Sequence, residues 1–386
     1  MVMDRSTSMI ELQFYPRYSA WGNEYLQLFY KALEPYGVRA RDGLVIQEKV
    51  LREKAPKLDI IQIQWAPEEI WRSGSHRLPN LPFGRLWQYL RVARLWRNLR
   101  LAKRLGLQVV WTVHDFVHPE GSRLVDRLGY LVLARSANLC ICHSAKIRRD
   151  LLRWYRARPE KIVVMHHGNY DGVFPLPHQR SQTLTGLDLS EDAKTLVCFG
   201  LIRPYKGFDV ALDALRLLGN EYQLIVVGAP FEPRFSNDLR KRAQGVPNVR
   251  LILEYVDKQR LTDFIHAADC VLMPYRRITG SGALLTSLTL GRGVVASDLP
   301  FFREILSREL GAGVLCSPGD ARDMARSIDV FFRIPAEHRH AAARRIADQC
   351  DWKLVIQPVG HWLRRTFPER TQYPRKLGDT AQASRV

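Results

Sequence analysis

The sequence predicts an α/β protein with two domains, each built on a parallel β-sheet covered by helices. Short apolar runs alternate with longer segments of helical periodicity, first over residues 9–165 and again over residues 195–332. Such alternation is typical of parallel strands joined by crossover helices. A stretch near residues 172–190 interrupts the alternation, and a chain of 386 residues exceeds the usual size of a single core. Both observations favour two doubly wound domains.

The N-terminal half contains five short, almost continuously apolar runs, as expected of buried parallel strands. The predicted strands cover residues 9–15, 60–65, 109–114, 138–142 and 161–165, and the predicted helices cover residues 24–33, 85–105, 122–135 and 144–155. The helix at 85–105 has an apolar face with Val92 and Leu95 and a basic face with Arg94 and Arg97. It fits a crossover helix packed on the sheet and also a membrane-surface helix, and the two interpretations are compatible.

The C-terminal half repeats the pattern. Strands are expected over residues 195–199, 223–227, 249–253, 270–273, 293–296 and 314–316, with an amphipathic helix over residues 352–363. We therefore expect an N-terminal domain over residues 1–178 and a C-terminal domain over residues 179–350. A helix within residues 351–370 is predicted to return to the first domain. Residues 371–386 are polar and are predicted to be disordered.

The charge of the chain predicts an anionic partner. The formal net charge is +19, of which +13 lies in residues 1–180. The basic residues lie inside periodic helices, and the sequence has no zinc-finger spacing, RNA-binding aromatic motif or basic tail. These features favour an acidic membrane surface or a phosphorylated substrate over nucleic acid.

The remaining composition predicts a cytoplasmic protein. No apolar run reaches the roughly 20 residues that a membrane-spanning helix needs, and the N-terminus lacks an apolar signal core. The six cysteines show no metal-ligand spacing, and most lie in apolar runs, which predicts reduced core residues. The sequence also lacks an Asp-x-Asp pair and clustered His or Cys ligands, so no metal and no cofactor are expected.

The most informative segment is the glycine turn after the strand at 195–199. Gly200 follows the strand, Gly207 precedes a helical pattern, and Arg203 and Lys206 lie between them. Glycine allows a ligand to approach the backbone closely, and a helix N-terminus presents free N–H groups and partial positive charge. Two cations beside such a turn predict a phosphate-binding site at the edge of the sheet.

A second glycine turn follows the strand at 270–273. Tyr275 ends the strand region, and Gly280, Ser281 and Gly282 lead into a helix that contains Thr286. Each turn alone is a weak signal, because short glycine motifs also occur in ordinary loops. Together they predict a site that grips one pyrophosphate from two sides.

These features resemble the nucleotide-sugar glycosyltransferases of GT-B architecture, and within them the retaining family 4. The resemblance covers about residues 9–362 and is strongest in the C-terminal half. The residues that carry it include Gly200, Lys206 and Gly207; Tyr255 and Val256; Ala268 and Asp269; Val294 to Ser297; Thr112 to Asp115; His166 to Asn169; and Trp21 to Asn23. It implies two Rossmann-like domains that face each other across a cleft. The implied activity is sugar transfer from a nucleotide donor to a lipid-linked or polysaccharide-precursor acceptor.

The chain departs from the family pattern at one pair of positions. The family has two glutamates around the second glycine turn, and the aligned residues here are Ile278 and Thr286. The position after Gly200 is Leu201 rather than arginine, and Arg203 is the expected substitute. The missing glutamates leave open an alternative, a non-catalytic nucleotide-sugar or membrane-binding module of a polysaccharide assembly. A nicotinamide oxidoreductase is not favoured, since neither half has a Gly-x-Gly-x-x-Gly turn.

The resemblance also implies roles for individual residues. Arg203 and Lys206 are expected to stabilise the leaving diphosphate, and His114, at a strand end, is expected to act at the reacting sugar. The residues expected to bind the donor are Gly22, Asn23, Gly200, Tyr255, Val256, Tyr275, Gly280, Ser281, Gly282 and Thr286. Asp115, Trp65 and His118 are expected on the acceptor side. The resemblance implies retention of anomeric configuration without a metal.

Overall fold

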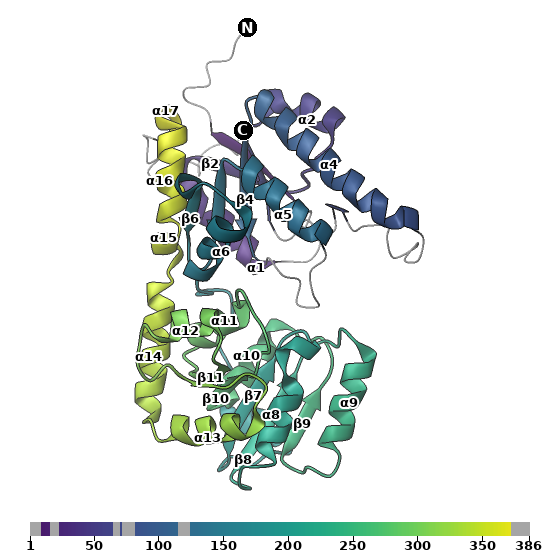
Figure 1. The fold of residues 1–386 in the computed structure, drawn as a ribbon. Coiled ribbons are helices and arrows are strands. Elements are labelled where there is room, and N and C mark those ends of the chain that lie inside the picture. The colour runs from purple at the N-terminus through teal and green to yellow at the C-terminus, as the bar shows by residue number, and fades with distance from the viewer. Residues whose placement is uncertain (1–8, 16–22, 65–69, 72–81, 115–123, 372–386) are drawn as a thin grey trace, which may run out of the picture. The chain divides into compact units, whose positions relative to one another are not determined.

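The computed structural model describes residues 9–15, 23–64, 70–71, 82–114 and 124–371. The chain divides into two compact units, one formed by residues 1–166 and 352–386 and the other by residues 167–351. Each unit has a six-stranded parallel sheet with flanking helices (Figure 1). This confirms the predicted fold class of two Rossmann-like sheets.

The first unit has the strand order β2-β1-β3-β4-β5-β6. Its strands are β1 (Ile10–Tyr15), β2 (Val38–Arg41), β3 (Ile60–Ile63), β4 (Gln108–Val113), β5 (Leu139–Cys142) and β6 (Ile162–Val164). Its helices are α1 (Glu24–Leu33), α2 (Glu48–Lys54), α4 (Pro82–Arg104), α5 (Leu124–Ser136), α6 (Ala145–Tyr155), α15 (Trp352–Val355), α16 (Gln357–Thr366) and α17 (Pro368–Thr371). Short 3-10 turns cover Glu34–Tyr36, Ala55–Lys57 and Pro159–Lys161.

Two apolar layers cover the faces of this sheet. One layer joins α2, α4, α5 and α6 to the strands through residues such as Leu51, Leu95 and Leu133. The other layer joins α1 and the C-terminal helices to the strands through Phe29 and Trp362. The helices α15 and α16 therefore contribute to the core of the first unit. The predicted single helix at 352–363 is divided between α15 and α16, with Pro358 in the first turn of α16.

The second unit has the strand order β12-β11-β10-β7-β8-β9. Its strands are β7 (Lys194–Phe199), β8 (Tyr222–Val227), β9 (Val249–Ile252), β10 (Cys270–Met273), β11 (Val294–Ser297) and β12 (Gly313–Cys316). Its helices are α7 (Arg180–Gly186), α8 (Phe208–Leu215), α9 (Pro233–Ala243), α10 (Lys258–Ala267), α11 (Gly282–Thr289), α12 (Pro300–Leu306), α13 (Ala321–Phe332) and α14 (Ala336–Gln349), with a 3-10 turn at Pro204–Lys206.

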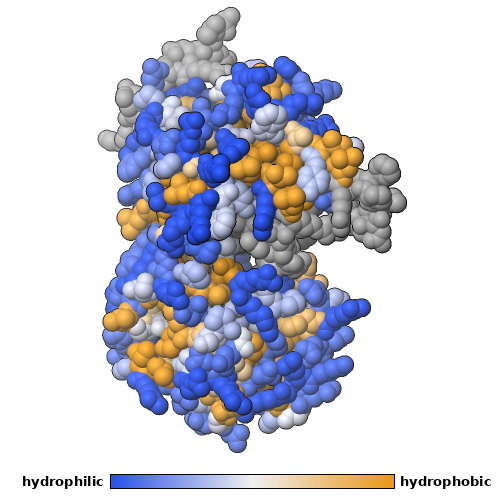
Figure 2. All heavy atoms as spheres, in the orientation of Figure 1, coloured by the Kyte–Doolittle hydropathy of each residue, from blue (hydrophilic) through white to orange (hydrophobic). Residues whose placement is uncertain are grey.

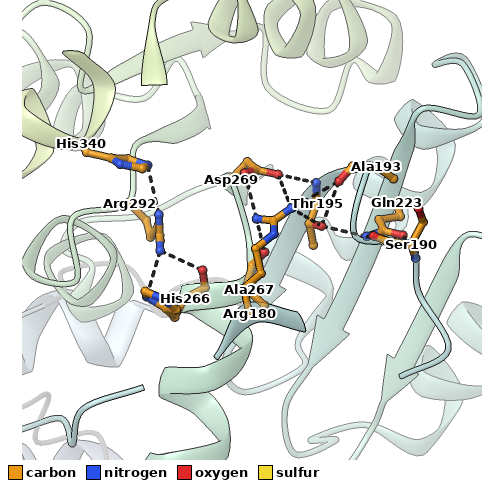
Figure 3. A network of polar contacts seen from close by, with 10 residues as sticks. All are labelled: Arg180, Ser190, Ala193, Thr195, Gln223, His266, Ala267, Asp269, Arg292 and His340. Atoms are coloured by element: carbon orange, nitrogen blue, oxygen red, sulfur yellow. Dashed lines mark hydrogen bonds and ion pairs between the residues drawn. The ribbon is translucent and has the colours of Figure 1, made fainter. Parts of the chain in front are cut away.

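Polar contacts attach the start of the second unit to its sheet and to the end of α14. Arg180, on α7, forms a two-point ion pair with Asp269 at 2.9 and 3.1 Å, and it also donates to the carbonyl oxygen of Ala267 (Figure 3). Asn169 donates from its backbone to the carbonyl oxygen of Cys350 and from its side chain to that of Ala347. The division predicted after residue 178 therefore lies after residue 166 in the structure. Residues 167–178 group with the second unit.

The same edge of the second sheet holds a second polar group. Arg292 lies between His340 and His266 and donates to one ring nitrogen of each at 3.0 Å (Figure 3). Because a guanidinium only donates, both ring nitrogens must carry lone pairs. Burial, with the charge of Arg292 as a second cause, lowers the pKa of both histidines. Both groups lie at the amino ends of the strands, opposite the edge where parallel sheets bind ligands.

Candidate active site

The strand order of the second unit identifies its ligand-binding edge. The chain builds outward from β7 through β8 to β9 and then continues on the other side with β10. Ligands of doubly wound sheets bind outside the carboxyl ends of the strands at such a reversal. Gly200 directly follows β7, and Pro274 directly follows β10. The two predicted glycine turns therefore flank the reversal point.

Glycines at this edge allow the backbone segments to approach closely. A Cβ at position 228 would lie 2.1 Å from the carbonyl oxygen of Gly200, and one at position 207 would lie 2.0 Å from that of Pro274. Gly200 and Gly207 have φ angles of 100° and 68°, which favour glycine. The close contacts explain why glycine occupies position 228, after β8, and position 207, which packs against Pro274 after β10.

Lys206 is the central cation of this edge. Its side chain is only 9% exposed, and its ammonium lies over the Tyr275 ring, 5.6 Å from the centroid. A Cβ at position 200 would lie 2.7 Å from Nζ, so Gly200 also makes room for this ammonium. Burial, with the charge of Arg203 as a second cause, lowers the pKa of Lys206 to about 8.

Arg203 lies on the same turn. Its guanidinium stacks on Phe231, with Cζ 3.8 Å from the ring centroid, and its buried Nε has no hydrogen-bond partner in the described structure. Among the residues described, neither Arg203 nor Lys206 has a carboxylate within ion-pair distance. Two cations without a carboxylate partner at this edge are able to hold an anion, since burial of an unpaired charge is costly.

The second glycine turn contributes a helix N-terminus. Ser281 caps α11, because its hydroxyl accepts from the backbone N–H of Leu284 at 3.2 Å. Burial raises the pKa of nearby Tyr275. Gly280 has open space around it, and a Cβ at Gly282 would lie 2.9 Å from the Tyr170 hydroxyl. Thr286 is buried within α11.

Arg276 joins the two turns, a role that the sequence did not reveal. Its guanidinium pairs with Asp209, at the start of α8, at 2.7 and 2.9 Å, and donates to the carbonyl oxygen of Pro204 at 2.7 Å. Tyr255, by contrast, is 81% exposed in the loop after β9, while Val256 packs against the core.

The first unit places its polar residues at the corresponding edge. Gln64, His114 and His143 are each the first residue after a strand, and their strands β3, β4 and β5 are neighbours in the sheet. His114 Nε2 lies 3.0 Å from Gln64 Oε1, and the His114 and His143 ring centroids are 5.1 Å apart. His114 and Gln64 lie at the ends of the predicted strands 109–114 and 60–65, and His143 directly follows the predicted strand 138–142, so the same signal could have found Gln64 and His143.

The remaining predicted site residues include a helix cap and positions outside the described residues. Asn23 caps α1, because its side-chain oxygen accepts from the backbone N–H of Leu26 at 3.2 Å. The predictions for Gly22, Trp65, Asp115 and His118 lie outside the described residues. Within the described ranges, no group of three or more His, Cys, Asp or Glu side chains is placed to hold a metal.

Comparison with known proteins identifies the family of the chain. Residues 193–332 match the family described as group 1 glycosyl transferases, and residues 72–169 match Glycosyltransferase Family 4. The chain is 30% identical over 281 residues to a GDP-mannose:glycolipid 4-beta-D-mannosyltransferase of Xanthomonas campestris pv. campestris. The aligned region covers 71% of this chain and 69% of the relative. The chain belongs to glycosyltransferase family 4. This family 4 member is an enzyme that uses a nucleotide-sugar donor, so the alternative of a non-catalytic module is not supported.

One more relative and two solved structures are also similar to this family 4 glycosyltransferase. A D-inositol 3-phosphate glycosyltransferase of Jonesia denitrificans is 28% identical over 274 residues, covering 65% of this chain and 64% of the relative. The crystal structure of HepE from Anabaena, in complex with UDP and glucose, has a TM-score of 0.68 at 17% identity and covers 92% of this chain and 100% of its own. Sucrose-phosphate synthase from Thermosynechococcus elongatus has a TM-score of 0.69 at 14% identity, with 93% and 100% covered. These two structures show the GT-B fold.

Proposed function

We propose that the enzyme transfers a sugar from a nucleotide donor to a lipid-linked or polysaccharide-precursor acceptor at the cytoplasmic face of a membrane. The observation that carries the donor part is buried Lys206 beside Gly200, without a carboxylate partner in the described structure. The acceptor part is supported by the Xanthomonas relative, whose name specifies a glycolipid. All six cysteines are free and buried, which fits a reducing compartment.

Lys206 and Arg203 would act on the leaving diphosphate. Negative charge grows on the β-phosphate as the bond to the sugar breaks. The two cations, with the backbone N–H groups at the start of α11, are fixed before the reaction, so little reorganisation is needed. Donors of this kind contribute about 3–4 kcal/mol each to the stability of the transition state. His114 would contact a hydroxyl of the donor sugar or the acceptor.

A double variant tests this role. With Arg203→Met and Lys206→Met together, we expect kcat/KM for the preferred donor to fall by at least about 10⁴-fold. The matched control is Arg240→Met with Lys241→Met, which removes the same charge from exposed positions on α9. Turnover at the wild-type rate in the site variant, or an equal loss in the control, contradicts the proposed donor site. A panel of UDP, GDP, ADP and TDP, read by thermal stabilisation, identifies the base.

The surface of α4 supports the membrane part of the proposal. The sequence of this helix has seven arginine and lysine residues and no carboxylate. Leu86, Trp87 and Leu90 are more than half exposed on its first turns, and Trp96 is 47% exposed beneath Arg100, whose Cζ lies 4.7 Å from its ring. Figure 2 shows hydrophobic side chains gathered over α4 and α5 on the first unit.

This pattern suits a helix that lies on an anionic bilayer. Apolar side chains enter the headgroup region, and arginines meet lipid phosphates. The other face of α4 is buried, with Leu95 and Leu99 in the core, so the crossover role holds at the same time. None of the described helices combines the length and hydropathy of a membrane span.

Vesicle binding tests the surface. Each basic residue near an anionic bilayer contributes about 1 kcal/mol. Replacement of Arg94 and Arg100 by Gln should therefore weaken binding to vesicles with phosphatidylglycerol by about 30-fold. The corresponding change at Arg240 and Lys241 should leave binding unchanged. Equal binding of wild type to vesicles of phosphatidylcholine alone overturns the electrostatic part.

The stereochemical outcome is a separate part of the proposal. The resemblance to family 4 implies retention, although Ile278 and Thr286 replace the family's glutamates. The Xanthomonas relative is named for a 4-β-D linkage. ¹H NMR of the product, made from a donor of known anomeric configuration, measures the outcome. An inverted product overturns retention and leaves the transfer reaction itself intact.

A further inference from the structure

The loops after β7 and β8 run side by side beyond the ends of the two strands. The strands pair in register as far as Phe199 and Val227. Beyond that point, the backbone N–H of Ile202 donates to the carbonyl oxygen of Ala229 at 2.9 Å, and the N–H of Phe231 donates to the carbonyl oxygen of Ile202 at 3.2 Å. These bonds fix the backbone of both loops and bring Phe231 beside the turn that holds the two cations.

The Phe231 ring is the contact that orients the Arg203 guanidinium. Cζ of Arg203 lies 3.8 Å from the ring centroid, which is within the distance of a cation–π contact. In the described part of the chain, the guanidinium has neither a hydrogen bond nor an ion pair, and its enclosed Nε has no acceptor. Arg203 therefore keeps its full charge, and stacking on the ring limits the rotation of its long side chain.

Phe231 contributes little to the core. Its side chain is 49% exposed, and among the described residues it belongs to neither apolar cluster of the second unit. A ring that is half exposed gains only part of the stabilisation that full burial would give. A shorter apolar side chain at position 231 should therefore leave the fold intact and remove the contact with Arg203.

Arg276, at the same edge of the sheet, is held in a different way. Its guanidinium donates two hydrogen bonds to Asp209, at 2.7 and 2.9 Å, and one to the carbonyl oxygen of Pro204. Such bonds lie in the guanidinium plane, and the carboxylate offsets the positive charge, so little remains for a ligand. An aromatic ring instead contacts the flat face of a guanidinium and leaves the N–H groups at its edge free.

Arg203 needs a contact of this kind because a second cation lies on the same turn. Burial is the main cause of the lowered pKa of Lys206, and the charge of Arg203 is the second cause. Like charges repel, so an Arg203 side chain without support would extend away from Lys206 into water. The Phe231 ring opposes this repulsion without adding a negative charge that would compete with a phosphate group.

We propose that Phe231 is a positioning residue whose ring holds the Arg203 guanidinium by its flat face and leaves its N–H edge to a diphosphate. The consequence for the ligand rests on the proposed function, whereas the stack itself does not. Phosphate oxygens accept hydrogen bonds in the guanidinium plane, so both contacts can exist at the same time. Loss of the ring should therefore weaken diphosphate binding, although Phe231 itself does not contact the diphosphate.

Nitrogen NMR of the full chain tests the stack without a ligand. In ¹H–¹⁵N spectra of ¹⁵N-arginine-labelled protein, the Nε–H signal of Arg203 is assigned by its loss in Arg203→Lys. An aromatic ring shifts protons above its face upfield. In Phe231→Leu, this signal should therefore move downfield, and its exchange with water should become faster. Phe231→Trp retains a ring and should keep the slow exchange. An Arg203 signal that is the same in wild type and Phe231→Leu overturns the inference.

Calorimetric titration measures the consequence for the ligand. The probes are inorganic pyrophosphate and whichever of UDP, GDP, ADP and TDP binds most tightly. Phe231→Leu should weaken binding of both probes about 2- to 30-fold, and Phe231→Trp should bind them as wild type does. In an Arg203→Met background, Phe231→Leu should cause no additional loss, because Phe231 acts through Arg203. An additional loss in that background, or a loss for the nucleotide that spares pyrophosphate, shows direct contact with the base and overturns the inference.

The matched control is a second stacked pair, which lies in the first unit. Trp154 is 65% exposed, and Cζ of Arg153 lies 4.8 Å from its ring centroid. Trp154→Leu also removes an exposed ring from an arginine, and it should change neither the Arg203 signal nor diphosphate binding. Thermal unfolding checks that each variant is folded, and Phe231→Met replaces Phe231→Leu if the latter does not fold.

The two experiments separate the inference from the proposed function. A wild type that binds neither pyrophosphate nor any of the four nucleotides refutes the proposed donor site. The Arg203 signal in Phe231→Leu then still decides whether the ring holds the guanidinium. Conversely, a wild type that binds pyrophosphate while its Arg203 signal and affinity are unaffected by Phe231→Leu retains the donor site and overturns the role of Phe231.

Discussion

The buried charge of Lys206 should lower the stability of the fold while it favours binding of a diphosphate. Replacement of Lys206 by methionine should therefore raise the stability and weaken the binding. The folded protein holds this buried ammonium with a pKa of about 8, against 10.5 for a free lysine. One pKa unit corresponds to 1.36 kcal/mol, so the charged form is disfavoured by about 3 kcal/mol in the folded state. Lys206→Met has a similar length and no charge. We therefore expect it to raise the unfolding free energy at pH 7 by about 3 kcal/mol.

The pH dependence of this gain has a definite sign. Between pH 8 and 10.5 the unfolded chain binds more protons at this position than the folded chain, so wild-type stability rises with pH there. The advantage of the variant should be complete below about pH 8 and should disappear by about pH 10.5. In a domain of this size, 3 kcal/mol corresponds to about 6–12 °C in the Tm of the second unit.

Calorimetric unfolding at pH 7 and pH 9.5, with titration of nucleoside diphosphates, provides the measurement. The variant should be more stable at pH 7 and should bind the diphosphate at least about 100-fold more weakly. Lys241→Met, which removes an exposed cation from α9, is the control and should change neither quantity. A variant that is less stable than wild type at pH 7, or that binds diphosphate equally well, refutes the reasoning.

Three further predictions concern stability. In Gly207→Ala, the new Cβ would lie 2.0 Å from the Pro274 carbonyl oxygen, so the unfolding free energy measured in urea should fall by at least about 2 kcal/mol. The control Gly245→Ala has a similar φ but open space around it and should lose less. Equal losses in the two variants contradict the close-packing argument. Burial lowers the pKa of His167 from 6.5 to about 4. About 3 kcal/mol of unfolding free energy should therefore be lost as the pH falls from 6.5 to 4. In equilibrium unfolding, His167→Asn should reduce this loss at low pH. Trp362→Ala should cost about 3–5 kcal/mol, seen as a lower Tm of the first unit with that of the second unchanged.

The sheets could be predicted because most strands are buried on both faces. The strand Cys270–Met273 and the helix Glu24–Leu33 have the predicted bounds, since continuous burial and a clear 3.6-residue period leave a strong signal. The strand Val38–Arg41 was missed. It lies at the edge of its sheet with Arg39 and Arg41 exposed, so its sequence resembles a polar loop.

The candidate site was predictable only where its residues are consecutive. The turn from Gly200 to Gly207 carries its glycines and cations within one segment. The ion pair between Arg276 and Asp209 joins residues that are 67 positions apart, so no local sequence pattern predicts it. Asp269 shows the converse. It matches the family pattern, yet it lies at the amino end of β10 and pairs with Arg180, so in this structure it holds the fold together.

The C-terminal helices give the chain an unusual order of assembly. The core of the first unit includes Trp352, Ile356 and Leu363, so this unit cannot close until these residues have left the ribosome. The second unit is one continuous segment, residues 167–351, and can fold while the first still lacks its last helices. During synthesis the second unit should therefore fold before the first, so the turn that carries Arg203 and Lys206 would be formed before the sheet edge that carries His114.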